Sequence, residues 1–116
     1  MIVDDEETLT YSLYQSFILA KQNYEVVTAS SGEEASDKLK AAKFDLVITD
    51  ISMPGMSGLE LLAWIQKNYP DTDVVVMTAY GSEDKKEEAM TLGARNYIEK
   101  PFEIKEINQM VMEILD

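Results

Sequence analysis

Short apolar runs alternate with amphipathic stretches along the chain, and this alternation is the feature that most limits how it can fold. The runs are rich in β-branched residues and are apolar on both sides, which is typical of strands buried within a parallel sheet. Five runs show this pattern: Met1-Ile2-Val3, Val26-Val27, Leu46-Val47-Ile48, Val74-Val75-Val76-Met77 and Tyr97-Ile98.

The stretches between these runs carry apolar residues at the spacing of a helix with one buried face. Each stretch therefore predicts one helix, with its apolar residues turned toward the core. The clearest inward positions are Leu9, Leu13, Phe17 and Ala20; Ala35, Leu39 and Ala42; Leu61, Leu62 and Ile65; and Ile104, Ile107, Val111 and Ile114.

Helix ends are marked by capping residues. Ser31 is placed to cap the second helix, and Glu34, three residues on, would complete a capping box. Glycine after a helix commonly supports its C-terminal cap. The remaining predicted boundaries are Ser57 or Gly58 before the third helix, Pro70 after it, Ser82 before the fourth helix and Gly93 after it.

Five strands alternating with five helices predict a doubly wound α/β domain built on a parallel sheet. Right-handed crossovers would then place helices on both faces of the sheet. The 116 residues suit a single core, so we expect one domain over residues 1–116. No apolar run approaches the ~20 residues that a membrane span requires.

Charge and composition exclude several kinds of function. Ten basic residues against 22 acidic ones give a net charge of −12, which argues against direct nucleic-acid binding, although solubility alone also accounts for it. The chain has no histidine and no cysteine, which excludes imidazole and thiolate catalysis or metal ligation. What remains is carboxylate chemistry with a hard cation. The lack of cysteine also agrees with a cytoplasmic location.

Residues whose side chains can bind a ligand or take part in a reaction lie at the predicted strand ends. The first run ends in Asp4-Asp5, the third in Asp50 and the fourth in Thr78. The fifth run ends in Lys100-Pro101. Ligands of open α/β sheets bind at the carboxyl ends of the strands, so these groups are expected on one rim. Like charges this close cost free energy unless something compensates them.

A divalent cation would compensate the carboxylates, and oxygen ligands suit Mg²⁺. We expect Asp5 and Asp50 to be direct ligands and Asp4 to act through water, with the Ser52 backbone carbonyl completing the protein ligands. The alternative for Asp4-Asp5 is a helix N-terminal cap, where acidic residues are favoured anyway.

Four segments occur in order at these strand ends: Ile2-Val3-Asp4-Asp5-Glu6, residues 49–58 (Thr-Asp-Ile-Ser-Met-Pro-Gly-Met-Ser-Gly), Val76-Met77-Thr78-Ala79 and Lys100-Pro101-Phe102. With them the chain resembles the receiver domains of bacterial two-component response regulators over essentially its whole length. The resemblance implies a flavodoxin-like (βα)5 three-layer sandwich with strand order 2-1-3-4-5. Residues 78–82 and 89–94 most resemble receivers of nitrogen-regulatory-type transcriptional activators, and receivers of hybrid kinases stay open as an alternative.

The resemblance implies a mechanism as well. The Asp50 carboxylate would attack a phosphohistidine of a sensor histidine kinase or phosphotransfer protein and form an aspartyl phosphate with the help of Mg²⁺. Lys100 would pair with Asp50 before transfer and with the phosphoryl oxygens afterwards, and the Lys100-Pro101 bond would be cis. Such a chain promotes its own phosphorylation and dephosphorylation and is not a turnover enzyme. An exposed surface lysine is the alternative for Lys100.

Two further residues would report the phosphorylated state. Thr78 matches the hydroxyl that moves to donate a hydrogen bond to the phosphoryl group, and Tyr97 matches the aromatic switch that turns inward behind it. The alternatives are an ordinary strand threonine and a buried strand tyrosine. The surface formed by the fourth helix, fifth strand and fifth helix would then contact an output domain or a second copy of the chain.

Positions near this site raise narrower expectations. Ser52 and Tyr80 match positions that border the path of the water that hydrolyses the phosphoaspartate, and the lifetime of that group does not follow from them. The charged residues 83–88 are expected to form a solvated helix face that is able to contact a partner.

Two other classes of protein compete with this interpretation. An aspartate-nucleophile phosphatase would carry Asp-x-Asp after its first strand, whereas Asp4 and Asp5 are adjacent. A docking module that is never phosphorylated would commonly lack an acidic residue or the lysine, and both are present here. The short first strand suggests that a few residues precede Met1, and the effector domain is expected outside this chain. Whether the receiver stands alone, its kinase, its stimulus and its oligomeric state do not follow from the sequence.

Overall fold

The computed structural model describes residues 1–20 and 23–115, and over these residues strands and helices alternate as the sequence predicts. The elements are β1 (Ile2–Val3), α1 (Glu7–Ile18), β2 (Thr28–Ala29), α2 (Gly32–Ala41), β3 (Leu46–Asp50), α3 (Gly58–Asn68), β4 (Asp73–Ala79), α4 (Glu83–Thr91), β5 (Asn96–Lys100) and α5 (Ile104–Leu115).

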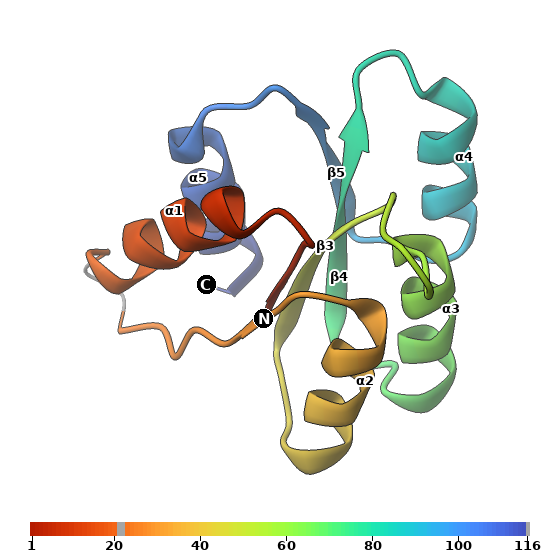
Figure 1. Ribbon diagram of the computed structural model, residues 1–116, viewed down its shortest axis with the longest axis horizontal. Helices are drawn as coiled ribbons and strands as arrows, with labels where there is room; N and C mark the ends of the chain where they lie inside the picture. Colours follow the sequence, from red (N-terminus) through yellow and green to blue (C-terminus); the bar gives the residue numbers. More distant parts are fainter. Residues whose placement is uncertain (21–22, 116) are drawn as a thin grey trace.

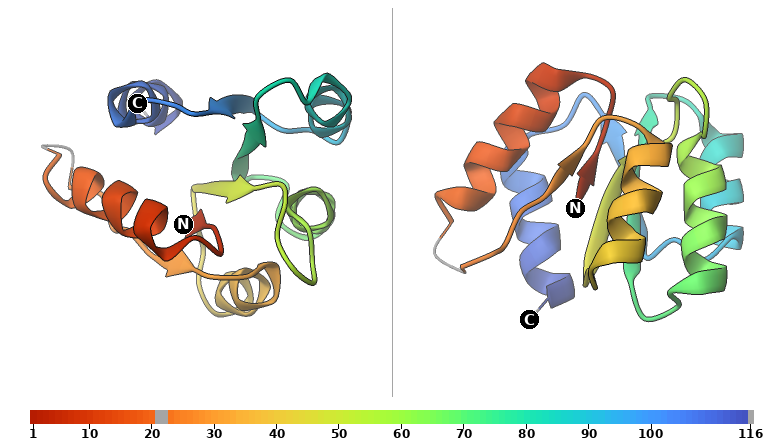
Figure 2. Two further views of the ribbon diagram at one scale, coloured as in Figure 1. Left: turned by 45° about the horizontal axis from the view of Figure 1, so that its top comes forward. Right: turned by 60° about the horizontal axis from the view of Figure 1, so that its bottom comes forward.

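The five strands form one sheet in the order β2-β1-β3-β4-β5, and every neighbouring pair is parallel. Helices α1 and α5 cover one face, and α2, α3 and α4 cover the other (Figures 1 and 2). The chain is therefore a three-layer doubly wound sandwich, and the predicted fold class and strand order are confirmed. The order reverses between β1 and β3, the point at which open α/β sheets bind ligands.

Successive residues of the central strands point to opposite faces, as the period of two in a strand requires. In β4, Val74 and Val76 pack with α2, α3 and α4, whereas Val75 and Met77 pack with α1 and α5. Both faces are buried, which explains why these runs are continuously apolar rather than alternating.

The predicted caps of α2 and α3 form, with one difference. Ser57 and Glu60 make a complete capping box at the start of α3. Ser31 caps α2 by accepting a hydrogen bond from the Glu34 backbone N–H. The Glu34 carboxylate, however, accepts from the backbone and hydroxyl of Ser30 and not from Ser31. The predicted box at Ser31 is therefore wrong in its second half, because Ser30 offers two donors to the same carboxylate.

Three other local predictions differ from the structure. Strand β2 begins at Thr28, so Val26-Val27 precede it, although the Val27 carbonyl accepts from the Ile2 backbone N–H. Ala42 is exposed because α2 ends at Ala41. Ser82 precedes α4 as predicted, but within the described part of the chain its side chain makes no capping hydrogen bond. Gly93 follows α4 with φ +104°, a conformation that favours glycine.

Membrane insertion by a helix has no support in the described part of the chain. Between residues 1 and 20 and between 23 and 115, every helix is too short or too polar to cross a bilayer.

Candidate functional site

The site lies at the carboxyl ends of β1, β3, β4 and β5. Val3 pairs with Thr49 in the sheet, so the residues that follow each of them, Asp4 and Asp50, lie side by side. Lys100 ends β5 and reaches both carboxylates, with its Nζ 3.2 Å from Asp4 Oδ2 and 3.4 Å from Asp50 Oδ1. Segments almost a hundred residues apart in the chain thus meet at one rim, as their positions at strand ends predict.

Three carboxylates cluster at this rim. Asp4, Asp5 and Asp50 each offer an oxygen, and these oxygens lie within 4.8 Å of one another. Asp4 and Asp50 are buried, whereas Asp5 is exposed. The three therefore surround a point that opens to solvent on the side of Asp5.

The charges in this cluster are only partly balanced. Burial, followed by repulsion from Asp4, raises the pKa of the Asp50 carboxyl, and the attraction of Lys100 opposes this rise. Burial lowers the pKa of the Lys100 ammonium, but Asp50 and Asp4 outweigh it, so that this pKa lies above its ordinary value. One ammonium faces three carboxylates, and repulsion among the carboxylates adds to the effect of burial on the pKa of Asp50.

Local hydrogen bonds hold Asp4 in place. Its Oδ1 accepts the Glu6 backbone N–H at 2.9 Å, and its backbone carbonyl lies 3.4 Å from the Thr10 hydroxyl. This is a turn ahead of α1 and not the helix cap considered as an alternative, because Glu6 is the N-cap residue of α1 and, among the described residues, its side chain makes no capping hydrogen bond. The turn coexists with the contact to Lys100 through the other oxygen of Asp4. Both oxygens of Asp4 have partners, so Asp5, which is exposed, and Asp50, which lies beside it, are better placed to meet a cation directly.

The residues fit a divalent cation. The donor set consists of carboxylate oxygens with solvent access, which matches the preference of Mg²⁺ for a few carboxylates and several waters. A cation between these oxygens would offset the repulsion from Asp4 that, after burial, contributes to the raised pKa of Asp50.

The loop after Asp50 is held by two residues whose roles the sequence alone did not reveal. Gly58 packs so closely on β3 that a Cβ there would lie 2.0 Å from the Asp50 carbonyl oxygen, and its N–H donates to the Ile51 carbonyl at 2.8 Å. Glu33 of α2 accepts the Met56 backbone N–H at 3.2 Å. The sequence indicates Gly58 only as a possible helix start, because a close backbone approach leaves no recognisable pattern in a single sequence.

The two proposed switch residues occupy different environments. Thr78 is buried, and its hydroxyl lies 3.5 Å from the Ile98 carbonyl, at the weak limit of a hydrogen bond. Tyr97 is 36% exposed as a residue, and its ring lies against the Lys86 ammonium, with 5.2 Å between the ring centre and Nζ. The buried strand tyrosine considered for Tyr97 is therefore excluded.

Lys86 contradicts one expectation. The sequence predicts residues 83–88 as a solvated helix face, yet Lys86 is buried and forms ion pairs with Glu83 and Glu99. A lysine in a charged run looks solvated in the sequence, and only the position of β5 beneath α4 shows where its side chain lies.

Other predicted positions lie where the strand ends place them. Ser52 and Tyr80 are both exposed on the loops that follow β3 and β4. The Lys100-Pro101 peptide bond is cis, as the family resemblance implies.

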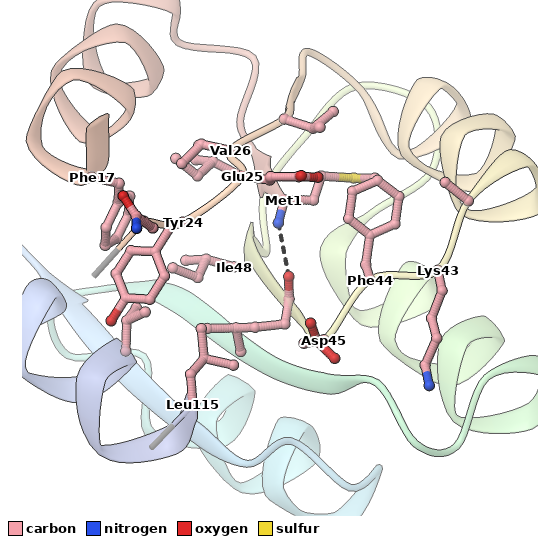
Figure 3. A pocket seen from close by; sticks show the side chains of 16 residues that line it. Met1, Phe17, Tyr24, Glu25, Val26, Lys43, Phe44, Asp45, Ile48 and Leu115 are labelled. Atoms are coloured by element: carbon pink, nitrogen blue, oxygen red, sulfur yellow. Dashed lines mark hydrogen bonds between the residues drawn. The ribbon is translucent and has the colours of Figure 1, made fainter. Parts of the chain in front are cut away.

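The described part of the chain has hollows near both ends of the strands. One of about 700 Å³ lies beside Asp4 and is lined by α1, β2 and the start of α2. Another, of about 420 Å³, lies at the amino ends of the strands and includes Met1, Phe44 and Asp45 (Figure 3). There the Met1 amine donates a hydrogen bond to the Leu46 carbonyl at 2.8 Å. Ligands of such sheets bind at the opposite edge, so the second hollow is separate from the Asp50 site.

Comparisons with known proteins agree on one family. The family model described as the response regulator receiver domain matches residues 1–112. Response regulator protein FleR of Pseudomonas aeruginosa is 40% identical over 111 residues, which cover 96% of this chain and 23% of FleR. Sporulation initiation phosphotransferase F of Bacillus subtilis is 36% identical over 99% of this chain and 91% of its own length.

The relatives differ in length, and the chain spans about a quarter of FleR and nearly half of the alkaline phosphatase synthesis regulator PhoP of Bacillus subtilis. Among solved structures, a response regulator receiver domain protein (CheY-like) of Methanospirillum hungatei superposes with a TM-score of 0.90 at 33% identity, covering 99% of this chain and 90% of that one. The DNA-binding transcriptional regulator NtrC of Klebsiella pneumoniae is 36% identical over 95% of this chain.

The sheet order, the acidic rim and these matches lead to the same conclusion. The chain belongs to the response regulator receiver domain family, the phosphorylation-dependent switches of two-component signalling.

Proposed function

We propose that Asp50 is the phosphoacceptor of this receiver. The observation that carries the proposal is its position: a carboxylate at the end of β3, next to two further carboxylates and 3.4 Å from the Lys100 ammonium. No requirement of the core explains this group of charges. An aspartate nucleophile beside a cation site and a fixed ammonium is the set of groups that phosphoryl transfer uses.

The transfer forms one bond and breaks one. A carboxylate oxygen of Asp50 attacks the phosphorus of a phosphohistidine presented by a sensor histidine kinase or phosphotransfer protein. The new O–P bond replaces the N–P bond, and the imidazole nitrogen leaves with the electron pair. Asp50 is buried and Asp5 beside it is exposed, so the phosphohistidine approaches from the side of Asp5.

Asp5, Asp50 and the Ser52 backbone carbonyl would hold Mg²⁺, and Asp4 would act through a water. Bound Mg²⁺ supplies positive charge that offsets the carboxylates and the phosphoryl oxygens. The exposure of Asp5 and the two occupied oxygens of Asp4 support this division of roles.

Lys100 holds the Asp50 carboxylate before transfer and binds a phosphoryl oxygen afterwards. Its contact with the buried Asp4 supports this, because that carboxylate keeps the ammonium at the rim while Asp50 changes partner. The long contact of the Thr78 hydroxyl with Ile98 leaves this hydroxyl able to move toward the phosphoryl group. Tyr97 then turns inward and changes the surface formed by α4, β5 and α5.

The remaining parts of the proposal concern partners. Residues 1–116 act as one receiver domain whose α4-β5-α5 surface contacts an output domain outside this chain or a second receiver. FleR and NtrC, of which this chain covers 23% each, support an output domain that lies outside residues 1–116. The net charge of −12 opposes direct binding to nucleic acid. The chain stores a phosphoryl group and turns over no external substrate, and family membership supports a cytoplasmic location.

Intact mass spectrometry after incubation with Mg²⁺ and acetyl phosphate tests the proposal. We expect one added phosphoryl group that requires Mg²⁺ and is absent in Asp50→Asn. Asp45→Asn is the matched control, because Asp45 is an exposed aspartate that precedes the same strand, and it should be phosphorylated normally. Continuous hydrolysis of acetyl phosphate would instead indicate a phosphatase, and a folded protein without any adduct would indicate a docking module.

A further inference from the structure

Lys86 has an unusual position for a lysine. It lies in the middle of the charged residues 83–88, yet its side chain is only 6% exposed. Lys86 and Ala89, one turn apart, are the buried residues of α4, so the face of this helix that meets the sheet includes a charged group. Lysines are almost never fully buried unless they are paired, so the partners of this ammonium explain its position.

The partners come from two elements. Glu99 of β5 and Glu83 of α4 both form ion pairs with the Lys86 ammonium, the latter at 3.0 Å. The ring of Tyr97 lies 5.2 Å from the same nitrogen. Tyr97 and Glu99 are alternate residues of β5 and share one face of the strand. The ammonium therefore lies over that face and joins α4 to β5.

Lys86 carries its positive charge at neutral pH. Hydrogen bonds to Glu99 and to Glu83 raise the pKa of the ammonium to about 12. A charged ammonium within about 6 Å of an aromatic ring is attracted to the face of that ring. The contact with Tyr97 therefore stabilises the outward position of the ring at any pH near neutrality.

We propose that Lys86 is a positioning residue that holds Tyr97 in its outward conformation and so opposes the switch until Asp50 is phosphorylated. The inference rests on the proposed role of Tyr97 in the switch. The contact exists only while the ring is outward, so it favours one of the two states and shifts their equilibrium. Glu99 supports this role because it keeps the ammonium over β5.

The contact with Lys86 raises the free energy needed to turn the Tyr97 ring inward. When the ring turns inward it leaves the ammonium, whereas the pairs with Glu83 and Glu99 can persist. The cost of the movement is then the loss of one cation–π contact, which corresponds to roughly a two- to fivefold change in the ratio of inward to outward ring. Its removal should raise the inward fraction of Tyr97 without any phosphoryl group.

Fluorine NMR of the unphosphorylated full chain labelled with 3-fluorotyrosine tests this directly. The chain has six tyrosines, and Tyr97→Phe identifies the resonance of interest. We compare Lys86→Met, which keeps the length of the side chain without its charge, with Lys86→Arg, which keeps the charge. In Lys86→Met the Tyr97 signal should shift toward that of the inward ring, as expected for a two- to fivefold rise in the ratio of inward to outward ring. In Lys86→Arg the signal should stay where it is in the unchanged chain.

Glu83→Gln is the matched control. It removes one carboxylate from the same ammonium, but the Glu83 side chain is 75% exposed and the contact with Tyr97 stays intact. We expect an unchanged Tyr97 signal. An equal shift in Glu83→Gln and Lys86→Met would overturn the inference, because the effect would then follow from charge alone. Lys86→Gln replaces Lys86→Met if the methionine variant does not fold.

A second measurement separates this inference from the proposed function. The rate of phosphorylation by acetyl phosphate should rise in Lys86→Met, and the rise should disappear in a Tyr97→Ala background. If Asp50 accepted no phosphoryl group, the proposed function would fail while the NMR result would still decide the role of Lys86. A lower melting temperature in Lys86→Met with no movement of the Tyr97 signal would leave Lys86 as packing only and refute its positioning role.

Discussion

Replacement of Gly58 by alanine would place a methyl group where the backbone of β3 already lies. A Cβ at this position lies 2.0 Å from the Asp50 carbonyl oxygen and 2.7 Å from the Ile51 Cα. Ordinary contacts between such atoms are about 3.5 Å, so α3 and the end of β3 must separate by more than 1 Å. Both atoms belong to the backbone, so no flexible side chain can absorb the movement.

The expected cost has two opposing parts. Overpacking of a closely packed site costs about 1–3 kcal/mol, and alanine recovers about 0.5–1 kcal/mol relative to glycine in a helix. We therefore expect Gly58→Ala to lower the free energy of unfolding by roughly 1–2 kcal/mol. A displacement of about 1 Å at a reacting group can reduce a rate by about a hundredfold, so phosphorylation of Asp50 should slow far more than stability suggests.

Urea unfolding and the rate of adduct formation with acetyl phosphate measure the two effects. Gly81→Ala is the control, since a Cβ there meets nothing within 4 Å of its position. Its φ of +84° makes alanine strained, so stability falls, but Asp50 should react at the normal rate. Normal stability and a normal rate in Gly58→Ala would refute the inference that this glycine sets the position of Asp50.

Three further predictions follow from the charges. Burial and repulsion from Asp4 raise the pKa of Asp50 in the folded protein, so ionisation of this carboxyl lowers the free energy of unfolding at pH values above its ordinary pKa of about 4. Asp50→Asn should therefore unfold at a higher urea concentration than the unchanged chain at pH 7. This difference should disappear below pH ~4, where the carboxyl is protonated in both the folded and the unfolded state. Mg²⁺ should raise the free energy of unfolding by about 2.7 kcal/mol at a hundred times its dissociation constant, and the melting temperature should rise with it. Asp5→Asn should bind Mg²⁺ more weakly in a calorimetric titration and gain less stability at the same concentration. Hydrogen bonds from Lys38 and Ser30 lower the pKa of Glu34 from 4.5 to about 2, so Glu34→Gln should lose stability relative to the unchanged chain at neutral pH and approach it between pH 4.5 and about 2.

Each of these predictions has a result that contradicts it. A pH-independent difference for Asp50→Asn would mean that its carboxylate is not under strain in the folded state. An unchanged Mg²⁺ affinity in Asp5→Asn would remove Asp5 from the cation site. A constant difference between Glu34→Gln and the unchanged chain down to pH 2 would show that the carboxylate contributes through packing and not through its charge.

Much of the fold follows from patterns that act locally. The runs Leu46-Val47-Ile48 and Val74-Val75-Val76-Met77 predict buried parallel strands because both faces of such a sheet must be covered. The spacing of Ile107 and Val111 predicts the buried face of α5 for the same reason. Where the pattern is weak, the predicted boundaries are less accurate. The sequence places the second strand at Val26-Val27, whereas β2 begins at Thr28 because its position depends on pairing with β1.

The sequence by itself determined the alternation of elements, the parallel sheet and the positions of Asp4, Asp50 and Lys100 at strand ends, since strand direction alone brings such ends to one rim. Only the tertiary structure decided that the Lys86 side chain is buried between α4 and β5 and that Gly58 touches the backbone of Asp50. Both depend on how closely two separate elements approach. That distance is set by packing across the whole core and leaves no periodic trace in the chain.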